Sequence, residues 1–406
     1  MEPPSAYDPL KGNDPNGLLA RVGGVWAGSE LQRQFQYEVA DLLKRTKPSF
    51  PGAQPVSFAA KHLEELKRED YYVCEKTDGM RYLLWMTDDN GRAIHYLIDR
   101  RNDYYFVDGL FFPHQDSKDF SKAHNHTILD GELVEDRYPD GTSSIKFFVF
   151  DCLVLDKNEL MPRPLDKRLA YFKNHVLEPY KKLLKAHPDT SMPFTTEDKN
   201  NEFSYGLEKM FKETIPKVKE LHGNDGLIFT CKNTPYCSGT DPHILKWKPP
   251  EENTVDFLLH ISWPSLQPDP SDPDQTPIED FYAFPEEFGL YVNYGENGRY
   301  EKHDTLYMSP EEWEQLKAMN RPLQDCIVEC FQQEVPPING MNGYGPTRRW
   351  RFHRFRDDKD DANHISTFES VIESIEDHVT EEDLLKHAAE IRSCWKARDA
   401  QKRSGR

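Results

Sequence analysis

Short runs of β-branched and aromatic residues fill the chain between residues 71 and 155, and they limit its fold more than any other feature. Asp88-Asp89-Asn90-Gly91 and Pro139-Asp140-Gly141, both typical hairpin turns, separate some of these runs. We therefore expect antiparallel sheets here. The expected strands are Tyr71–Glu75, Met80–Met86, Ala93–Asp99, Tyr104–Asp108, Thr127–Glu135 and Lys146–Leu155.

Helical spacing of apolar residues appears on both sides of this region. Positions three and four residues apart are apolar in three segments, which predicts helices that cover a sheet face. The expected helices are Ser29–Arg45, Leu165–Ala186 and Phe203–Leu221.

The chain changes character after Pro249-Pro250, where a polar, proline-interrupted stretch begins and includes an acidic loop over residues 267–280. Short strands around one helix then suit a small OB-fold barrel. The strands are expected at Thr254–Ser262, Phe288–Asn293, Asp325–Gln332 and Arg349–Phe355, and the helix at Pro310–Met319. Ser366-Thr367-Phe368-Glu369 is interpreted as a capping box that opens a terminal helix, and Thr380 with Asp383 as a second start.

These elements predict an α+β protein of 406 residues. Its parts would be a domain of antiparallel sheets flanked by helices (residues 1–250), a C-terminal OB-fold barrel (251–365) and a helical tail (366–406) that packs back on the body.

Bulk composition excludes several classes of protein. No apolar run reaches 18 residues and no apolar signal core opens the chain, so we expect a soluble, intracellular protein. Seven cysteines without a CxxC pair argue against a disulfide framework or a zinc ribbon. Fifty-one Lys and Arg against 70 Asp and Glu give a net charge of −19, so any polyanion must be bound locally.

Residues 74–82 carry a K-x-D-G-x-R signature between two expected strands, with Lys76 and Arg81 at its ends. Attack by a lysine requires a neutral amine, whereas the usual side-chain pKa is about 10.4. Neighbouring cations and desolvation both favour the neutral form. Lys246 and Lys248 could supply these cations from one face of a strand, although a K-x-K pair alone more often faces solvent.

Two Asp-Gly pairs offer carboxylates beside a flexible backbone. Asp130-Gly131-Glu132 is expected at the end of a strand, and Asp225-Gly226 at the start of another. Such a carboxylate can accept a ribose hydroxyl or hold Mg²⁺, although a lone Asp-Gly more often marks a turn. The apolar run Phe147–Asp151 is expected mainly in the core, with one aromatic ring free to stack on a purine.

Arginines are concentrated near the end of the second region, where five fall within nine residues: Arg348, Arg349, Arg351, Arg354 and Arg356. Alone, the cluster is best interpreted as a solvated strand face. Arg356, Asp358 and Lys359 also form an R-x-D-K pattern, whose cations could bind pyrophosphate.

Taken in order, KxDGxR, DGE, the aromatic strand, DG-apolar, KxK and RxDK resemble the covalent nucleotidyltransferases, a superfamily of mRNA capping enzymes and polynucleotide ligases. The resemblance covers roughly residues 34 to 364. Leu245-Lys246-Trp247-Lys248-Pro249 followed by Asn253-Thr254-Val255-Asp256-Phe257 is similar to the fungal type of mRNA guanylyltransferase.

The resemblance implies a role for each matched residue. Lys76 would be the nucleophile that forms a phosphoramidate with GMP, and Asp225 would help to hold the metal, Mg²⁺ or Mn²⁺. The implied substrate contacts are Arg81 and Glu132 with ribose, Phe150 with guanine, Lys199 with guanine O6, Arg100 near the phosphates, Lys246 and Lys248 with the α-phosphate, and Arg356, Asp358 and Lys359 with the β- and γ-phosphates. Asp256 also matches a family position, with its role left open.

The implied reaction transfers GMP from GTP through the lysine to the 5′-diphosphate end of nascent RNA, giving a GpppN cap. The barrel would close over GTP for the first step and reopen for the second. The resemblance further implies a nuclear location, the phosphorylated C-terminal tail of RNA polymerase II as a partner, and a separate chain for the RNA triphosphatase step.

Two other functions remain open from the sequence. An ATP-dependent polynucleotide ligase would share the scaffold and the lysine chemistry. A non-catalytic OB-type RNA-binding scaffold would share the fold but would not become covalently labelled by a nucleotide.

Overall fold

The computed structural model describes residues 17–249, 252–266, 278–295, 298–335, 347–357 and 359–404. The chain divides into two compact units: Met1–Trp247 together with Glu381–Arg406, and Lys248–Thr380. The division thus falls after Trp247, whereas Glu251, where we expected it, lies outside the described residues. The tail 366–406 is not one piece, because its first part belongs to the second unit and its last part to the first.

The first unit is built on two sheets. One has the strand order β1-β6-β5-β4-β7-β8-β10, with β9 also paired to β8, and the other has the order β11-β3-β12-β13-β2. The strands of the first sheet are β1 (Val25–Trp26), β4 (Met80–Asp89), β5 (Arg92–Ile98), β6 (Tyr104–Phe106), β7 (Thr127–Arg137), β8 (Ser143–Leu155), β9 (Asn158–Glu159) and β10 (Thr195–Asp198). Those of the second are β2 (Ala53–Ser57), β3 (Tyr71–Thr77), β11 (Glu202–Phe203), β12 (Asn224–Cys231) and β13 (Gly239–Trp247).

All six strands expected between residues 71 and 155 are confirmed. Pairing is antiparallel except for β10 with β8 and β2 with β13, which run parallel. The Asp130-Gly131-Glu132 segment, however, lies inside β7 and does not end it, because β7 continues to Arg137.

Helices cover the first sheet on both faces. The helical segments of this unit are α1 (Leu18–Arg21), α2 (Ser29–Leu42), α3 (Lys61–Arg68), α4 (Leu165–Tyr171), η1 (Phe172–Leu177), α5 (Glu178–Ala186), α6 (Leu207–Lys209), η2 (Met210–Thr214), α7 (Ile215–Lys219) and α10 (Glu381–Ser404). Along β4, Leu84 joins a core cluster with Phe172 and Tyr180, whereas Leu83 joins another with Val39. Successive side chains of β4 thus point to opposite faces of the sheet, and both faces are covered. Most of β4 is therefore buried, and the middle of its sequence is continuously apolar and does not alternate between apolar and polar residues.

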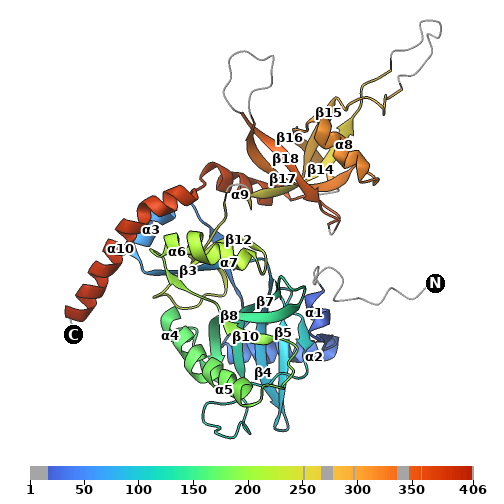
Figure 1. Cartoon of the computed structure of the whole chain (residues 1–406). Coiled ribbons are helices and arrows are strands. Elements are labelled where there is room, and N and C mark those ends of the chain that lie inside the picture. Colours follow the sequence, from blue (N-terminus) through green and yellow to red (C-terminus); the bar gives the residue numbers. More distant parts are fainter. Residues whose placement is uncertain are drawn as a thin grey trace, which may run out of the picture. The chain divides into compact units, whose positions relative to one another are not determined.

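The helix predictions hold for residues 29–45 and 165–186, the second with a π-helical turn, η1, in its middle. The prediction for Phe203–Leu221 is wrong at its start. Phe203 belongs to β11, which pairs with β3, and the helical segment begins only at Leu207. In Figure 1, α4 and α5 lie together along one side of the first sheet, and α10 runs beside α3.

The second unit contains one five-stranded antiparallel sheet with the order β16-β15-β14-β17-β18. Its elements are β14 (Thr254–Ser262), β15 (Glu287–Asn293), β16 (Tyr300–Thr305), α8 (Pro310–Ala318), β17 (Cys326–Val335), β18 (Thr347–Phe355) and α9 (Ile365–Glu376). A bridge between Leu306 and Trp350 brings the chain after β16 to the opposite edge strand, β18, so the sheet curls as expected for an OB-type fold. Most of the loop over residues 267–280 lies outside the described residues.

Two details of this unit differ from expectation. Strand β16 was not predicted, because its sequence Tyr-Glu-Lys-His-Asp-Thr has no apolar alternation. The capping box proposed at Ser366 is also wrong, since His364 is the N-cap of α9 and its side chain accepts a bond from Ser366 N. Within the described part of the chain, no helix is long and apolar enough to cross a membrane.

Candidate active site

A cavity in the first unit is lined by both sheets. Six of the residues singled out in the sequence line it: Lys76, Arg81, Arg100, Glu132, Phe150 and Lys199. Lys76 lies on β3 of the second sheet and Arg81 on β4 of the first, so the K-x-D-G-x-R segment crosses from one sheet to the other. The turn between them requires glycine, because a Cβ at Gly79 would lie 2.7 Å from Glu132 Cγ. The signature therefore joins two walls of the same cavity.

The amine of Lys76 forms an ion pair with Asp225 at the start of β12. Its Nζ lies 2.7 Å and 2.8 Å from the two carboxylate oxygens, and both side chains are about three-quarters buried. The sequence predicted a role for Asp225 only in holding the metal and did not predict this ion pair. As long as the amine donates to both carboxylate oxygens, it is not available to attack a phosphorus.

Lys246 shares a sheet face with the cavity lining. Lys246 on β13 pairs with Ile228 on the neighbouring strand β12. Ile228 in turn pairs with Cys74 on β3, two residues before Lys76. Residues paired across strands point to the same face, and Ile228 and Cys74 both line the cavity. Leu245 and Trp247 are buried as the alternation predicted. Lys248 is the first residue of the second unit.

Arg81 is anchored by a buried carboxylate. Its Nε and Nη2 donate to the two oxygens of Asp130 at 3.0 Å and 2.7 Å, and Tyr236 Oη donates to the same carboxylate at 2.6 Å. Asp130 is fully buried. Burial opposes the charge of Arg81, but Asp130 outweighs it and raises the pKa of the guanidinium. Arg81 also lies 5.5 Å from the ring of Phe150, so this buried pair supports an aromatic wall of the cavity.

Lys199 is buried among acidic and hydroxyl groups. Its Nζ donates to Thr77 Oγ1 and lies 3.5 Å from Glu75 and 3.8 Å from Glu132. Thr77 in turn donates to Glu132. This places a fixed cation in the wall of the cavity, next to a carboxylate that lines it.

Behind Lys199 lies a second layer of charged groups that sequence patterns did not reveal. His222 contacts Asp136 through Nδ1 at 2.7 Å and Glu75 through Nε2 at 3.4 Å. Burial opposes the charge on His222, but Glu75 and Asp136 outweigh it, so the pKa of His222 is raised. Burial also disfavours the charge on Glu75, yet His222 and Lys199 keep its pKa lowered. The result is a connected row of alternating charges.

Arg100 differs from the other cavity cations. Within the described ranges, no carboxylate lies at ion-pair distance from it, and its side chain is exposed where it lines the cavity. Partial desolvation and the nearby Arg81 lower its pKa. A cation without a protein counterion at a cavity wall is suited to an anionic ligand.

In the second unit, Asp256 on β14 forms ion pairs with two of the expected phosphate-binding cations. Arg356 Nη1 lies 3.0 Å and 3.1 Å from its carboxylate oxygens, and Lys359 Nζ donates to the same carboxylate. Asp256 is buried and is held through its backbone by Asn363. Asp358, the remaining polar member of the R-x-D-K pattern, lies outside the described residues.

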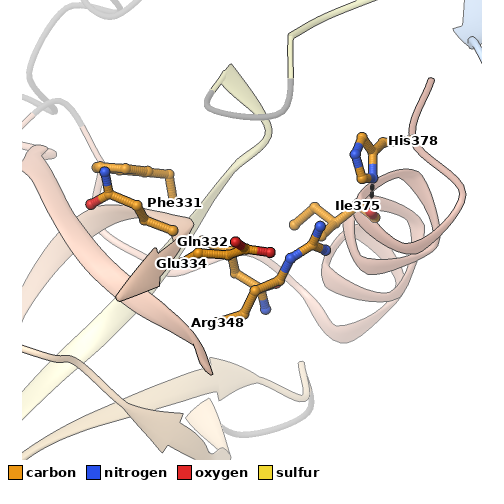
Figure 2. A pocket seen from close by; sticks show the side chains of 7 residues that line it. Phe331, Gln332, Glu334, Arg348, Ile375 and His378 are labelled. Carbon is orange, nitrogen blue, oxygen red and sulfur yellow. Dashed lines mark hydrogen bonds between the residues drawn. The ribbon is translucent and has the colours of Figure 1, made fainter. Parts of the chain in front are cut away.

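Carboxylates of the same unit pair with most of the arginine cluster. Arg351 pairs with Glu312 and Arg354 with Glu329. Arg348 instead lines a separate hollow between the ends of β17 and β18 and the end of α9, where it extends toward Ile375 (Figure 2). The cluster is therefore largely a set of structural ion pairs.

Comparisons with known proteins agree over nearly the whole chain. Residues 19–250 match the family described as mRNA capping enzyme, catalytic domain, and residues 252–385 match mRNA capping enzyme, C-terminal domain. The mRNA-capping enzyme subunit alpha of Neurospora crassa is 49% identical over 402 residues, covering 94% of both chains. That of Schizosaccharomyces pombe is 45% identical over 379 residues, covering 92% of this chain and 88% of the relative.

Among solved structures, an ATP-dependent DNA ligase from bacteriophage T7 in complex with ATP is similar over 75% of this chain and 98% of its own. Its TM-score is 0.33 at 16% identity, which is too low to bear on the choice between ligase and capping enzyme. The two family matches and the fungal relatives do bear on it: the chain belongs to the mRNA capping enzyme family.

Proposed function

We propose that the chain is an mRNA guanylyltransferase in which Lys76 carries GMP from GTP to the 5′-diphosphate end of RNA. The observation that carries the proposal is one cavity whose walls, built around two sheets, hold a lysine amine, an aromatic ring, a carboxylate and an exposed arginine with no carboxylate at ion-pair distance among the residues that the structure describes. These are the groups that a nucleoside triphosphate requires: a nucleophile, a phosphate ligand, a stacking surface and a ribose acceptor.

In the first half-reaction, Lys76 Nζ attacks the α-phosphorus of GTP. A nitrogen–phosphorus bond forms, the bond from that phosphorus to the bridging oxygen breaks, and pyrophosphate leaves. The ammonium must first lose a proton, and the carboxylate of Asp225 is the group in contact with it. Transfer of this proton from Lys76 Nζ to an oxygen of Asp225 would leave the lone pair that attacks the phosphorus, and the proton lost when the nitrogen–phosphorus bond forms would leave with pyrophosphate.

Asp225 also has the donor atoms for a divalent cation, because carboxylate oxygens are the ligands that Mg²⁺ and Mn²⁺ prefer. Held there, such a cation would supply positive charge to the triphosphate oxygens. Either metal fits a carboxylate, so the chemistry of the site does not separate them.

The nucleoside would occupy the cavity between the sheets. Phe150 would stack on guanine, with Arg81 behind its ring, and Glu132 would accept a ribose hydroxyl. Lys199 would donate to guanine O6. Arg81 has both of its Asp130-facing nitrogens engaged, so we assign it mainly to positioning Phe150.

The phosphates would be bound by Arg100, Lys246 and Lys248. In the second half-reaction, an oxygen of the RNA 5′-diphosphate attacks the phosphorus of the lysyl-GMP. The nitrogen–phosphorus bond breaks, and Lys76 leaves as the amine after its nitrogen takes up a proton, for which the Asp225 carboxyl group is the nearest donor. The roles expected for Arg356, Asp358 and Lys359 at the β- and γ-phosphates stay predictions, with Asp256 as the residue that positions two of them.

Relatives named subunit alpha support a role for this chain beside another subunit. We propose that this partner is an RNA triphosphatase, that the phosphorylated tail of RNA polymerase II recruits the chain, and that it acts in the nucleus.

The test is covalent labelling with α-labelled nucleotide in the presence of Mg²⁺ or Mn²⁺. GTP should label the wild-type chain and the Lys61→Ala control, which removes an exposed lysine, whereas Lys76→Ala should remain unlabelled. The label should then pass to 5′-diphosphate RNA. Labelling by ATP and not GTP would favour the ligase alternative, and labelling by neither would favour a non-catalytic scaffold.

A further inference from the structure

Among the described residues, one group of metal-ligating side chains lies apart from the cavity. It comprises His114, His124 and Asp156, whose ligand atoms all lie within 4.8 Å of one another. Both histidines are buried, with 8% and 1% of their surface exposed, while the Asp156 side chain is 25% exposed. The group is therefore buried at the two histidines and reaches solvent at Asp156.

The backbone fixes the two histidines as neighbours. Residues 112 to 124 fold back on themselves, with His114 N donating to Lys122 O at 2.8 Å and His124 N donating to Phe112 O at 2.9 Å. The histidines are thus diagonal neighbours on one face of this pairing, with ring centroids 5.1 Å apart. Asp156 follows the end of β8, where its N donates to Thr127 Oγ1 at 2.9 Å. Two distant parts of the chain meet here.

Both ring nitrogens of His124 lie next to oxygen acceptors. Its Nε2 lies 2.9 Å from the carbonyl oxygen of His175, and its Nδ1 lies 3.0 Å from a carboxylate oxygen of Asp156. If the ring proton is on Nε2, where it is donated to His175, the lone pair of Nδ1 is directed at Asp156. A metal ion between these two groups would use that lone pair and the carboxylate oxygen as ligands.

His114 directs a nitrogen at the same carboxylate. Its Nε2 lies 3.4 Å from Asp156 Oδ2. Coordination through Nε2 would move the ring proton to Nδ1, where an oxygen of Asp116 lies 3.6 Å away and can accept it. Asp116 N, which now donates to Nδ1, would turn to solvent.

We propose that His114, His124 and Asp156 form a zinc site with water as its fourth ligand. Zinc bonds of about 2.0 to 2.1 Å in a tetrahedron place neighbouring ligand atoms about 3.3 Å apart. The separations from Asp156 to the two histidines, 3.0 Å and 3.4 Å, lie within about 0.3 Å of this value, and the ligand atoms of the two histidines lie within 4.8 Å of each other. Two imidazoles and a carboxylate suit zinc better than Mg²⁺ or Ca²⁺. The ion would fasten the segment before β7 to the end of β8, the strand that carries Phe150.

The experiment measures zinc bound to the full-length chain. EDTA-treated protein is equilibrated with zinc in excess Mg²⁺, which competes for Asp225, and zinc per chain is counted by plasma mass spectrometry. Wild type and Asp225→Asn should each hold about one zinc more than the His114→Gln/His124→Gln double variant. His260→Gln is the matched control, because it removes an exposed histidine that lies 2.9 Å from Asp325. It should behave as wild type.

Thermal unfolding keeps the test decisive if the double variant does not fold. Zinc should raise the melting temperature of wild type by several degrees, as any ligand specific to the folded state does, and should leave His114→Gln unchanged. Equal zinc content in wild type and the double variant, or no shift of the wild-type melting temperature, would overturn the proposal. Either result would mean that hydrogen bonds alone hold Asp156 beside the two histidines.

Discussion

The buried pair of Arg81 and Asp130 allows a quantitative prediction for Asp130→Asn. Asp130 is fully buried and accepts three hydrogen bonds, two from Arg81 and one from Tyr236. Asparagine keeps the shape of the Asp130 side chain but removes its negative charge. Its amide nitrogen would also replace one acceptor oxygen, so that a donor would face a donor of Arg81 or Tyr236. Removal of one partner from a buried ion pair costs about 3 to 5 kcal/mol. Because asparagine keeps one oxygen acceptor, we expect about 3 kcal/mol.

The assay is urea unfolding of the full chain, followed by tryptophan fluorescence and analysed for the transition of the first unit. A loss of this size corresponds to a fall in melting temperature of roughly 6 to 12 °C for a unit of this length. Asp108→Asn is the matched control, because its pair with Arg92 is exposed, at 3.4 Å, and such surface pairs contribute under about 1 kcal/mol. Equal effects of the two variants would refute the reasoning, since burial would then not set the cost.

Three further predictions follow from the charged groups. Burial lowers the pKa of His95 to about 4. The stability that depends on its neutral ring is therefore complete above about pH 6.5, and the free energy of unfolding falls by about 3 kcal/mol as the pH falls toward 4. In His95→Phe, the urea midpoint should depend less on pH over this range. His222 has a raised pKa in the folded chain, so its contribution to the free energy of unfolding is present below about pH 6.5 and is lost as the pH rises through that folded-state pKa. His222→Gln should therefore lower the stability more at pH 6 than at pH 9. A larger loss at pH 9 would contradict the raised pKa. Removal of divalent metal with EDTA should abolish covalent labelling by GTP, and Asp225→Asn should raise the Mg²⁺ or Mn²⁺ concentration needed to restore it; an unchanged metal requirement in a titration of labelling would argue against Asp225 as a ligand.

The strands were predictable from the sequence because their residues carry the signal locally. β-branched and aromatic runs with turn residues between them located all six strands from β3 to β8, and alternation placed Leu245 and Trp247 in the core. Strand β16 was missed because its exposed, charged residues carry no such alternation. Its pairing with β15 comes from the backbone.

The cavity was predictable in its members but not in their partners. Six of the residues singled out in the sequence line it, because the motifs fix which side chains lie near the ends and middles of particular strands. Lys76, however, pairs with a residue 149 positions away, and Arg81 with one 49 positions away. Each pair joins neighbouring strands of one sheet, β3 with β12 and β4 with β7, and spacing along the chain does not encode which strands pair. The ion pair of Lys76 is therefore the main feature of the cavity that the sequence did not predict.

Identification of the residue that carries GMP tests the central claim most directly. The full-length chain is incubated with GTP and a divalent metal, quenched, digested and mapped by tandem mass spectrometry under conditions that preserve phosphoramidates. We predict a single GMP adduct on the peptide that contains Lys76, at the Nζ of that residue. An adduct on Lys199 or Lys246 instead, with Lys76 unmodified, would contradict it.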